Sequence, residues 1–250
     1  MSTMPAVATT DLLGAEKVFG FLREQLLDGE LKPGDKLLGE RELSLALGVS
    51  RPVLREALRS LAMLGFLDIR HGKGAYVRSA DISMLADFFT FCLAQQPDIL
   101  DDVMQARIAI ECQAIRLACT RATDGDLARI ASKLSRLMDT LNDPEQGGQA
   151  DYAFHLSIVE TSRSPALITL YEAVSGLLQR SHVQRRRLTV AVPGILDYLV
   201  EAHREVFLSI VGRDPDVADR RLREHFAIGD EFRRKSYIAA FSKGAETRQD

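Results

Sequence analysis

The sequence predicts a mainly α-helical protein of two domains, with β-structure confined to a short segment before residue 79. Apolar residues recur at intervals of three and four along most of the 250 residues, which is the spacing of one helix face. Strand patterns are confined to the neighbourhood of a glycine-rich turn near residue 72. Beyond residue 83 the patterns are helical and are separated by proline and Asn/Asp signals. We therefore expect a first domain over 11–78, a linker over 79–82 and an antiparallel all-α bundle over 83–241.

The composition indicates a globular protein of a reducing compartment. Hydrophobic residues make up 46% of the chain, which is enough for a packed core. No apolar run approaches the roughly 20 residues of a membrane span, and the N-terminus lacks the basic and apolar regions of a secretory signal. The three cysteines form no paired motif, which favours reduced thiols. We expect a cytoplasmic protein that does not contact a membrane.

The first domain is expected to begin with a helix over residues 12–28 that is capped by Asp11. A turn and a short strand over 36–38 follow it. A helix over 40–47 then ends at Gly48, because glycine tolerates the left-handed conformation that is common just past a helix end.

A second helix follows this short turn, and a hairpin follows the helix. Ser50 is a suitable N-cap, Pro52 fits a first turn where a missing N–H costs little, and Leu64 is expected to end the buried face. Two strands, over 66–70 and 75–78, flank a turn whose two glycines permit positive φ. Two short helices, a tight turn and a hairpin are the plan of a winged helix-turn-helix domain.

The outer face of the second helix carries a row of arginines. Arg51, Arg55 and Arg59 are spaced by four, so their side chains lie on one side of the helix. Between Arg41 and Arg78 there are seven basic residues against three acidic ones, a local net charge of +4 in a chain of net charge −3. The row could be an ordinary solvated face, but the cap, the hairpin and the charge together favour a helix that reads the DNA major groove.

The second domain is expected to contain six or seven amphipathic helices joined by short loops. The predicted helices cover residues 83–95, 98–122, 124–141, 149–161, 165–188, 193–211 and 215–241.

Three of the five histidines fall on these predicted bundle helices together with an aspartate. Asp151 and His155 are four residues apart, so both side chains face the same way, while His203 and His225 lie on two later helices. An oxygen and three imidazoles suit Zn²⁺, Ni²⁺ or Mn²⁺. Spacing alone leaves the alternative open, because histidines on helices are commonly core or surface residues.

Four segments of the first domain together form a specific family pattern: Pro33-Gly34-Asp35, Glu40 to Leu43, Gly48 to Leu58 and His71 to Gly74. On these segments the domain resembles the DNA-binding domain of GntR-type bacterial transcription regulators. The resemblance implies that Arg41, Arg51 and Arg55 contact DNA and that the wing turn with His71 and Gly72 enters the minor groove. Arg59 and Lys73 extend this predicted surface.

The second domain resembles the FCD ligand-binding domain of the FadR subfamily. The matching segments begin at Arg107, Asp151, Glu201 and Arg223. The resemblance implies that one aspartate and three histidines, here Asp151, His155, His203 and His225, hold a divalent ion, with zinc the first expectation and nickel or manganese possible. It also implies that Arg107 meets the carboxylate of a small organic-acid effector. Metal affinity should fall below about pH 6, because protonated histidine cannot ligate.

Two other features of the bundle have weaker signals. His182 and the run Gln184 to Arg187 are interpreted as a solvated basic helix end, the alternative being that one arginine faces the cavity or a partner subunit. His71 is assigned to the wing and not to the metal.

These observations predict a homodimeric repressor of a metabolic operon that binds a palindromic operator and responds to an organic acid at or near the metal. Three alternatives remain open: a purely structural metal, a metal-dependent hydrolase or lyase that uses the Asp/His₃ site, and a regulator that binds a long acyl ligand in place of a metal-bound acid.

Overall fold

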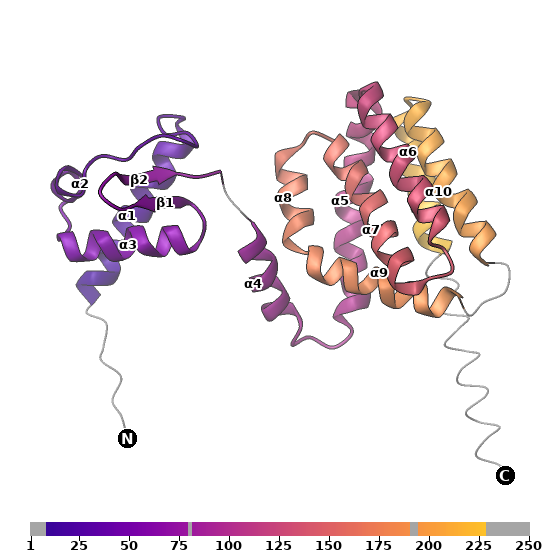
Figure 1. Ribbon diagram of the computed structural model, residues 1–250, viewed down its shortest axis with the longest axis horizontal. Coiled ribbons are helices and arrows are strands. Elements are labelled where there is room, and N and C mark those ends of the chain that lie inside the picture. Colours follow the sequence, from indigo (N-terminus) through magenta and orange to yellow (C-terminus); the bar gives the residue numbers. More distant parts are fainter. Residues whose placement is uncertain (1–8, 80–81, 191–194, 229–250) are drawn as a thin grey trace, which may run out of the picture. The chain divides into compact units, whose positions relative to one another are not determined.

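The computed structural model describes residues 9–79, 82–190 and 195–228, and the chain divides into two compact units between Met84 and Leu85 (Figure 1). The first unit contains α1 (Thr9–Leu27), α2 (Glu40–Leu47), α3 (Arg51–Met63), β1 (Leu67–Arg70) and β2 (Gly74–Val77). The remaining elements are α4 (Ser83–Leu93), α5 (Ile99–Arg121), α6 (Asp124–Asp139), α7 (Pro144–Thr161), α8 (Pro165–Ala173), α9 (Ser175–Val190) and α10 (Ile195–Val211). A further helix is described over residues 215–228.

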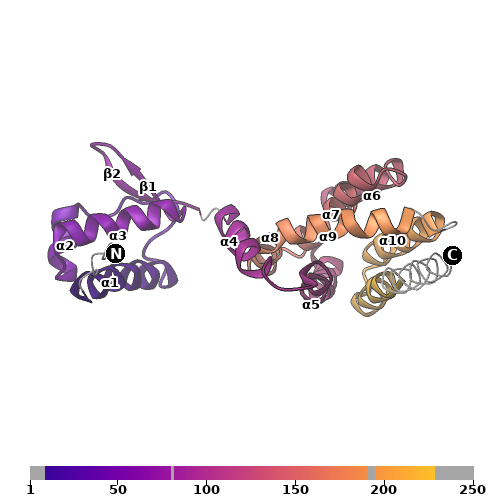
Figure 2. The same cartoon turned by 90° about the horizontal axis from the view of Figure 1, so that it is seen from below.

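The first unit is a three-helix cluster with a β-hairpin, as the sequence predicts. α3 packs against α1 and α2 around a core that includes Leu22, Leu43 and Leu54. β1 and β2 pair antiparallel from Leu67 opposite Val77 to Arg70 opposite Gly74, and the hairpin projects away from the helices (Figure 2).

The turn between α2 and α3 forms by the mechanism expected from the sequence. Gly48 ends α2 with a φ of +62°, and Ser50 caps α3 by accepting a hydrogen bond from the Val53 N–H at 3.5 Å. Gly72 and Gly74 have φ values of +70° and +103°, so both glycines of the wing turn adopt the conformation that favours glycine.

Three expectations for this unit need correction. α1 is already helical at Thr9, so Asp11 lies inside the helix and does not cap it. The strand expected over residues 36–38 is a single bridge between Lys36 and Tyr76. Leu64 follows the end of α3 and is 45% exposed, because the helix ends one residue earlier and leaves this side chain beside an open pocket.

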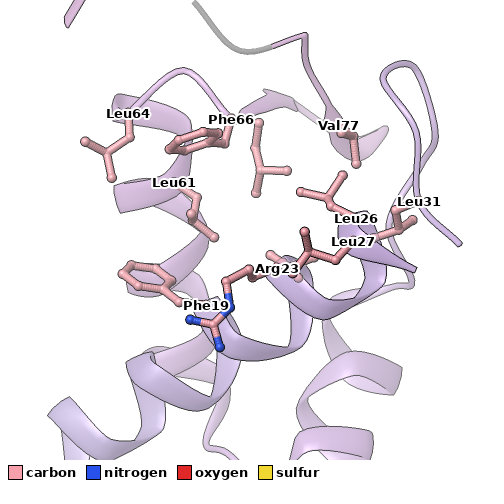
Figure 3. Close-up of a pocket in the computed structure, with 11 residues that line it drawn as sticks. Phe19, Arg23, Leu26, Leu27, Leu31, Leu61, Leu64, Phe66 and Val77 are labelled. Carbon is pink, nitrogen blue, oxygen red and sulfur yellow. The ribbon is translucent and has the colours of Figure 1, made fainter. Parts of the chain in front are cut away.

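That pocket lies between α1 and the end of α3 and has a volume of about 470 Å³ (Figure 3). Phe19, Leu26, Leu61, Leu64 and Phe66 contribute to a lining that is almost wholly apolar. The pocket is therefore an accessible apolar surface of the first unit.

The second unit is an α-helical bundle. α7 packs most extensively against α9 and also contacts α5 and α6, so it lies in the middle of the bundle (Figure 1). Its inward face, with Phe154 and Ile158 fully buried, joins a core to which α5, α6, α10 and the helix over 215–228 contribute.

Two helix predictions in the bundle are wrong in their bounds. The helix expected over 165–188 is two helices, because Val174 leaves the helical conformation before Ser175 and Gly176, so the described part of the bundle has eight helices instead of six or seven. α7 begins at Pro144, five residues before the predicted start. Asp143 caps it by accepting hydrogen bonds from the N–H groups of Glu145 and Gln146, although a glycine pair follows. Of the helix expected over 215–241, the part beyond 228 lies outside the described residues.

Within these described ranges, no helix is both long enough and apolar enough to cross a membrane.

Candidate functional site

The predicted DNA-contacting residues lie together on exposed positions of the first unit. Arg51, Arg55 and Arg59 are on α3 with side chains that are 56%, 52% and 70% exposed. Arg41, at the start of α2, is exposed as well, as are His71, Gly72 and Lys73 in the wing turn. The structure therefore leaves all seven side chains or backbone positions accessible to a ligand.

Glu40 partly neutralises this row. Its Oε2 lies 2.7 Å from Arg55 Nε and 3.7 Å from Arg51 Nη2, and all three side chains are at least 40% exposed. Exposed ion pairs of this kind contribute little free energy, so a DNA phosphate or base edge can replace Glu40 as the partner.

The three bundle histidines meet in the interior of the second unit. His155 comes from α7, His203 from α10 and His225 from the helix over 215–228, and each contributes a ligand atom within 4.8 Å of the others. Their exposed fractions are 0%, 1% and 7%. Burial is the first cause that lowers the pKa of His203 and of His225, which favours the neutral rings that a metal requires.

Two of the histidine rings have hydrogen-bond partners that would orient them toward a metal ion. His155 Nδ1 lies 2.6 Å from Glu111 Oε2, and His203 Nδ1 lies 2.7 Å from the Leu199 carbonyl oxygen. Such partners hold the Nδ1 hydrogen and leave Nε2 to ligate. His155 Nε2 and His225 Nδ1 are buried and have no hydrogen-bond partner among the described residues. The residues present therefore fit a divalent ion.

Asp151 borders the histidine cluster without being part of its most compact group. Its Oδ1 lies 3.4 Å from Nε2 of both His155 and His203. Burial alone would raise the pKa of Asp151, but the nearby His182 and His203 lower it well below its usual range. The carboxylate is thus ionised and close enough to share a cation with the histidines.

Arg107 and Glu111 form a buried pair beside the cluster, on α5. Arg107 Nε donates to Glu111 Oε1 at 2.8 Å, and the Tyr171 hydroxyl donates to the same oxygen at 2.8 Å. Burial opposes the charge of Glu111, but Arg107 and then His155 outweigh it and lower the pKa of Glu111 to about 2. Arg107 Nη2 lies 3.9 Å from Asp151 Oδ1. The predicted effector-binding residue therefore faces the predicted metal ligands.

The sequence was interpreted as placing His182 and Arg186 on a solvated helix end, and this interpretation is wrong. They are 3% and 2% exposed, four residues apart on α9, and both contact Asp151. His182 Nδ1 lies 3.2 Å from Oδ1, and Arg186 Nη2 lies 2.9 Å from Oδ2. Because α9 packs closely on α7, these side chains point into the bundle, while Arg187 remains 65% exposed. Arg186 therefore faces the interior of the bundle at Asp151 and not the solvent.

Gly148 explains how α9 comes so close to α7. A Cβ at Gly148 would lie 2.7 Å from Val183 Cα on α9, and one at the neighbouring Gly147 would lie 2.7 Å from the Thr140 carbonyl oxygen. Both contacts are with backbone, which cannot move aside as a side chain can. The absence of a side chain at Gly148 therefore permits the close approach that brings His182 and Arg186 to Asp151.

Gly148→Ala should therefore destabilise the protein by about 1–3 kcal/mol, since overpacking against backbone outweighs the gain in helix propensity. Denaturant unfolding measures the change. Gly125→Ala is the matched control, because its Cβ would have a single ordinary contact at 3.8 Å in α6. Equal stability of the two variants would show that the close approach of α7 and α9 is not under strain at this position.

Comparison with protein families matches both units. Residues 15–77 match the model described as bacterial regulatory proteins, gntR family, and residues 102–227 match the FCD domain. The second match begins just before Arg107 and ends just after His225.

Individual relatives and solved structures agree with these matches. The chain is 32% identical over 219 residues to the "Putative L-lactate dehydrogenase operon regulatory protein" of Escherichia coli K12, covering 86% of this chain and 84% of that protein. It is 28% identical to the "HTH-type transcriptional regulator LutR" of Bacillus subtilis, with 79% and 91% covered. The "Galactonate operon transcriptional repressor" of Escherichia coli K12 is also 28% identical, with 80% and 87% covered. A solved structure, "Streptococcus agalactiae GntR", has a TM-score of 0.62 at 26% identity and covers 86% of this chain and 97% of its own.

Proposed function

Because the chain belongs to the GntR family of bacterial regulatory proteins and carries an FCD domain, we propose that it is a metal-dependent, acid-responsive repressor of a metabolic operon. That it is a DNA-binding transcription regulator and not an enzyme follows from the family and its named relatives. The proposal concerns what it senses and how.

The observation that carries the proposal is the buried histidine cluster with its outer shell. Zn²⁺ is the ion we propose, held by Asp151, His155, His203 and His225, with Ni²⁺ or Mn²⁺ as substitutes. When bound, the ion would supply positive charge and an open position for an anion. Glu111 and the Leu199 carbonyl orient two of the rings.

The proposed effector is a small organic acid bound beside this cluster. Arg107 is buried, faces Asp151 and retains donors for a carboxylate, which supports this assignment. Two relatives are named for operons of L-lactate dehydrogenase and of galactonate. L-lactate and galactonate are both hydroxy carboxylates, so we propose this class for the present chain as well.

On DNA, we propose a homodimer that places two copies of α3 about 34–36 Å apart in successive major grooves of a palindromic operator. Effector binding changes DNA affinity only to the extent that the acid binds the two arrangements of the dimer differently. For a repressor, the acid binds the DNA-free arrangement more tightly and releases the operator.

Metal content tests the sensing part of this proposal. Protein purified without chelator or affinity metal should contain about one Zn, Ni or Mn ion per chain. His203→Ala should lose the ion, because the change removes one of the four proposed ligands. The ion is measured by inductively coupled plasma mass spectrometry.

His71→Ala is the control, since that histidine lies in the exposed wing turn of the other unit and should leave the ion content unchanged. An ion-free parent protein that also fails to take up added Zn²⁺, or a His203→Ala variant with undiminished content, would contradict the metal site.

A further inference from the structure

His182 is a buried polar side chain that neither the predicted metal set nor the predicted effector contact uses. Its ring lies beside Asp151. The centroid of the His182 ring lies 5.8 Å from that of the His155 ring and 6.0 Å from that of the Tyr152 ring. It does not belong to the group of histidines whose ligand atoms lie within 4.8 Å of one another. His182 therefore borders the metal site without joining the compact cluster.

The contact with Asp151 determines which ring nitrogen carries the hydrogen. A carboxylate accepts hydrogen bonds, so His182 Nδ1, 3.2 Å from Asp151 Oδ1, carries the hydrogen and donates it. Nε2 is then a bare acceptor, and it is buried without a hydrogen-bond partner among the described residues.

A second buried atom nearby is a hydrogen-bond donor that lacks an acceptor. Arg107 Nη2 is a donor, is buried, and likewise has no hydrogen-bond partner in the described part of the chain. Both side chains approach the same carboxylate, Asp151, from α5 and α9. An acceptor and a donor that both lack a hydrogen-bond partner, beside one oxygen of Asp151, suit a ligand that offers both a hydrogen and an acceptor oxygen.

We propose that His182 reads the hydroxyl hydrogen of a 2-hydroxy acid whose carboxylate binds Arg107. This inference rests on the proposed effector function and specifies its selectivity. A 2-hydroxy acid satisfies both atoms, because its hydroxyl donates to Nε2 and its carboxylate accepts from Nη2. The matching 2-oxo acid has no hydroxyl hydrogen and would place a second acceptor against Nε2, and the unsubstituted acid leaves Nε2 unpaired.

L-lactate, pyruvate and propionate form a matched set of probes, since they differ only at the second carbon. Isothermal titration of the metal-loaded protein should give an affinity for L-lactate at least about 30-fold above that for pyruvate or propionate, because a site built for a hydroxyl rejects analogues that lack it. His182→Phe keeps the ring shape and removes both nitrogens. It should bring the three affinities within about threefold of one another and leave propionate binding nearly unchanged.

Two further variants distinguish the loss of the His182 contact from a folding defect. His182→Gln can return an acceptor oxygen near the position of Nε2 and should recover part of the preference, whereas Arg180→Ala, on an exposed position of the same helix, should behave as the parent. Equal binding of the three acids by the parent, or full preference in His182→Phe, would overturn the role of His182 and leave the effector function standing. Absence of binding of all three acids to the parent would overturn the effector function together with this inference.

Discussion

Replacing Arg51 and Arg55 together with alanine is expected to abolish operator binding while the protein remains folded. Both side chains are more than half exposed on α3, and their contacts in the free protein are surface pairs with Glu40. Each arginine that reaches a base or phosphate contributes about 1–3 kcal/mol, so the loss of both should lower the affinity by at least about 30-fold. Fluorescence anisotropy on a DNA site selected by the parent from a random pool measures the loss.

Arg23→Ala is the control for this variant, because it removes one positive charge from the same unit at a 71% exposed position on α1. It should weaken binding by less than about threefold, as expected for a distant charge at physiological salt. An Arg51→Ala/Arg55→Ala protein that binds the site within a factor of about three of the parent would refute the assignment of α3 as the recognition helix.

Replacing Glu111 with glutamine should produce the largest loss of stability among single changes near the metal site. Glu111 is fully buried and accepts from Arg107 Nε, from the Tyr171 hydroxyl and at His155 Nδ1. The substitution keeps the shape but removes the nearest counter-charge of the buried Arg107 and leaves only Asp151 at 3.9 Å, a change that costs about 3–5 kcal/mol. Loss of the carboxylate behind His155 should also weaken metal binding by about 10–100-fold.

Denaturant unfolding and competition with a fluorescent chelator measure the two effects. Glu160→Gln on α7 provides a control, since that carboxylate is 43% exposed and lies 3.7 Å from Arg129, and it should change stability by less than about 1 kcal/mol. A Glu111→Gln protein as stable as Glu160→Gln would mean that another group neutralises Arg107.

Local sequence signals were sufficient to predict the DNA-binding unit. Gly48, Ser50 and the wing glycines act through backbone conformation and capping, which depend on near neighbours and can be inferred without the tertiary fold. The prediction failed at Leu64, which has the spacing of a buried residue but is exposed because α3 ends at Met63.

The proposed metal site can be predicted only in part from the sequence, because its residues come from separate helices. Asp151 and His155 show their relation through i, i+4 spacing on one helix. His182 and Arg186 have the same spacing on α9, and that spacing was a usable signal, but the surrounding arginines made the segment look solvated. Their burial depends on the close approach of α9 to Gly148 on α7, and no local pattern connects the two segments.

Operator affinity of the metal-loaded protein, measured with and without L-lactate, tests the proposed regulation most directly. We expect L-lactate to lower the affinity by about tenfold or more, in the range of ordinary allosteric coupling. Removal of the ion with a chelator, or the change His203→Ala, should abolish this response while DNA binding itself persists. An operator affinity that does not change with L-lactate or other 2-hydroxy acids, or a response that persists without the ion, would contradict metal-dependent regulation by an acid.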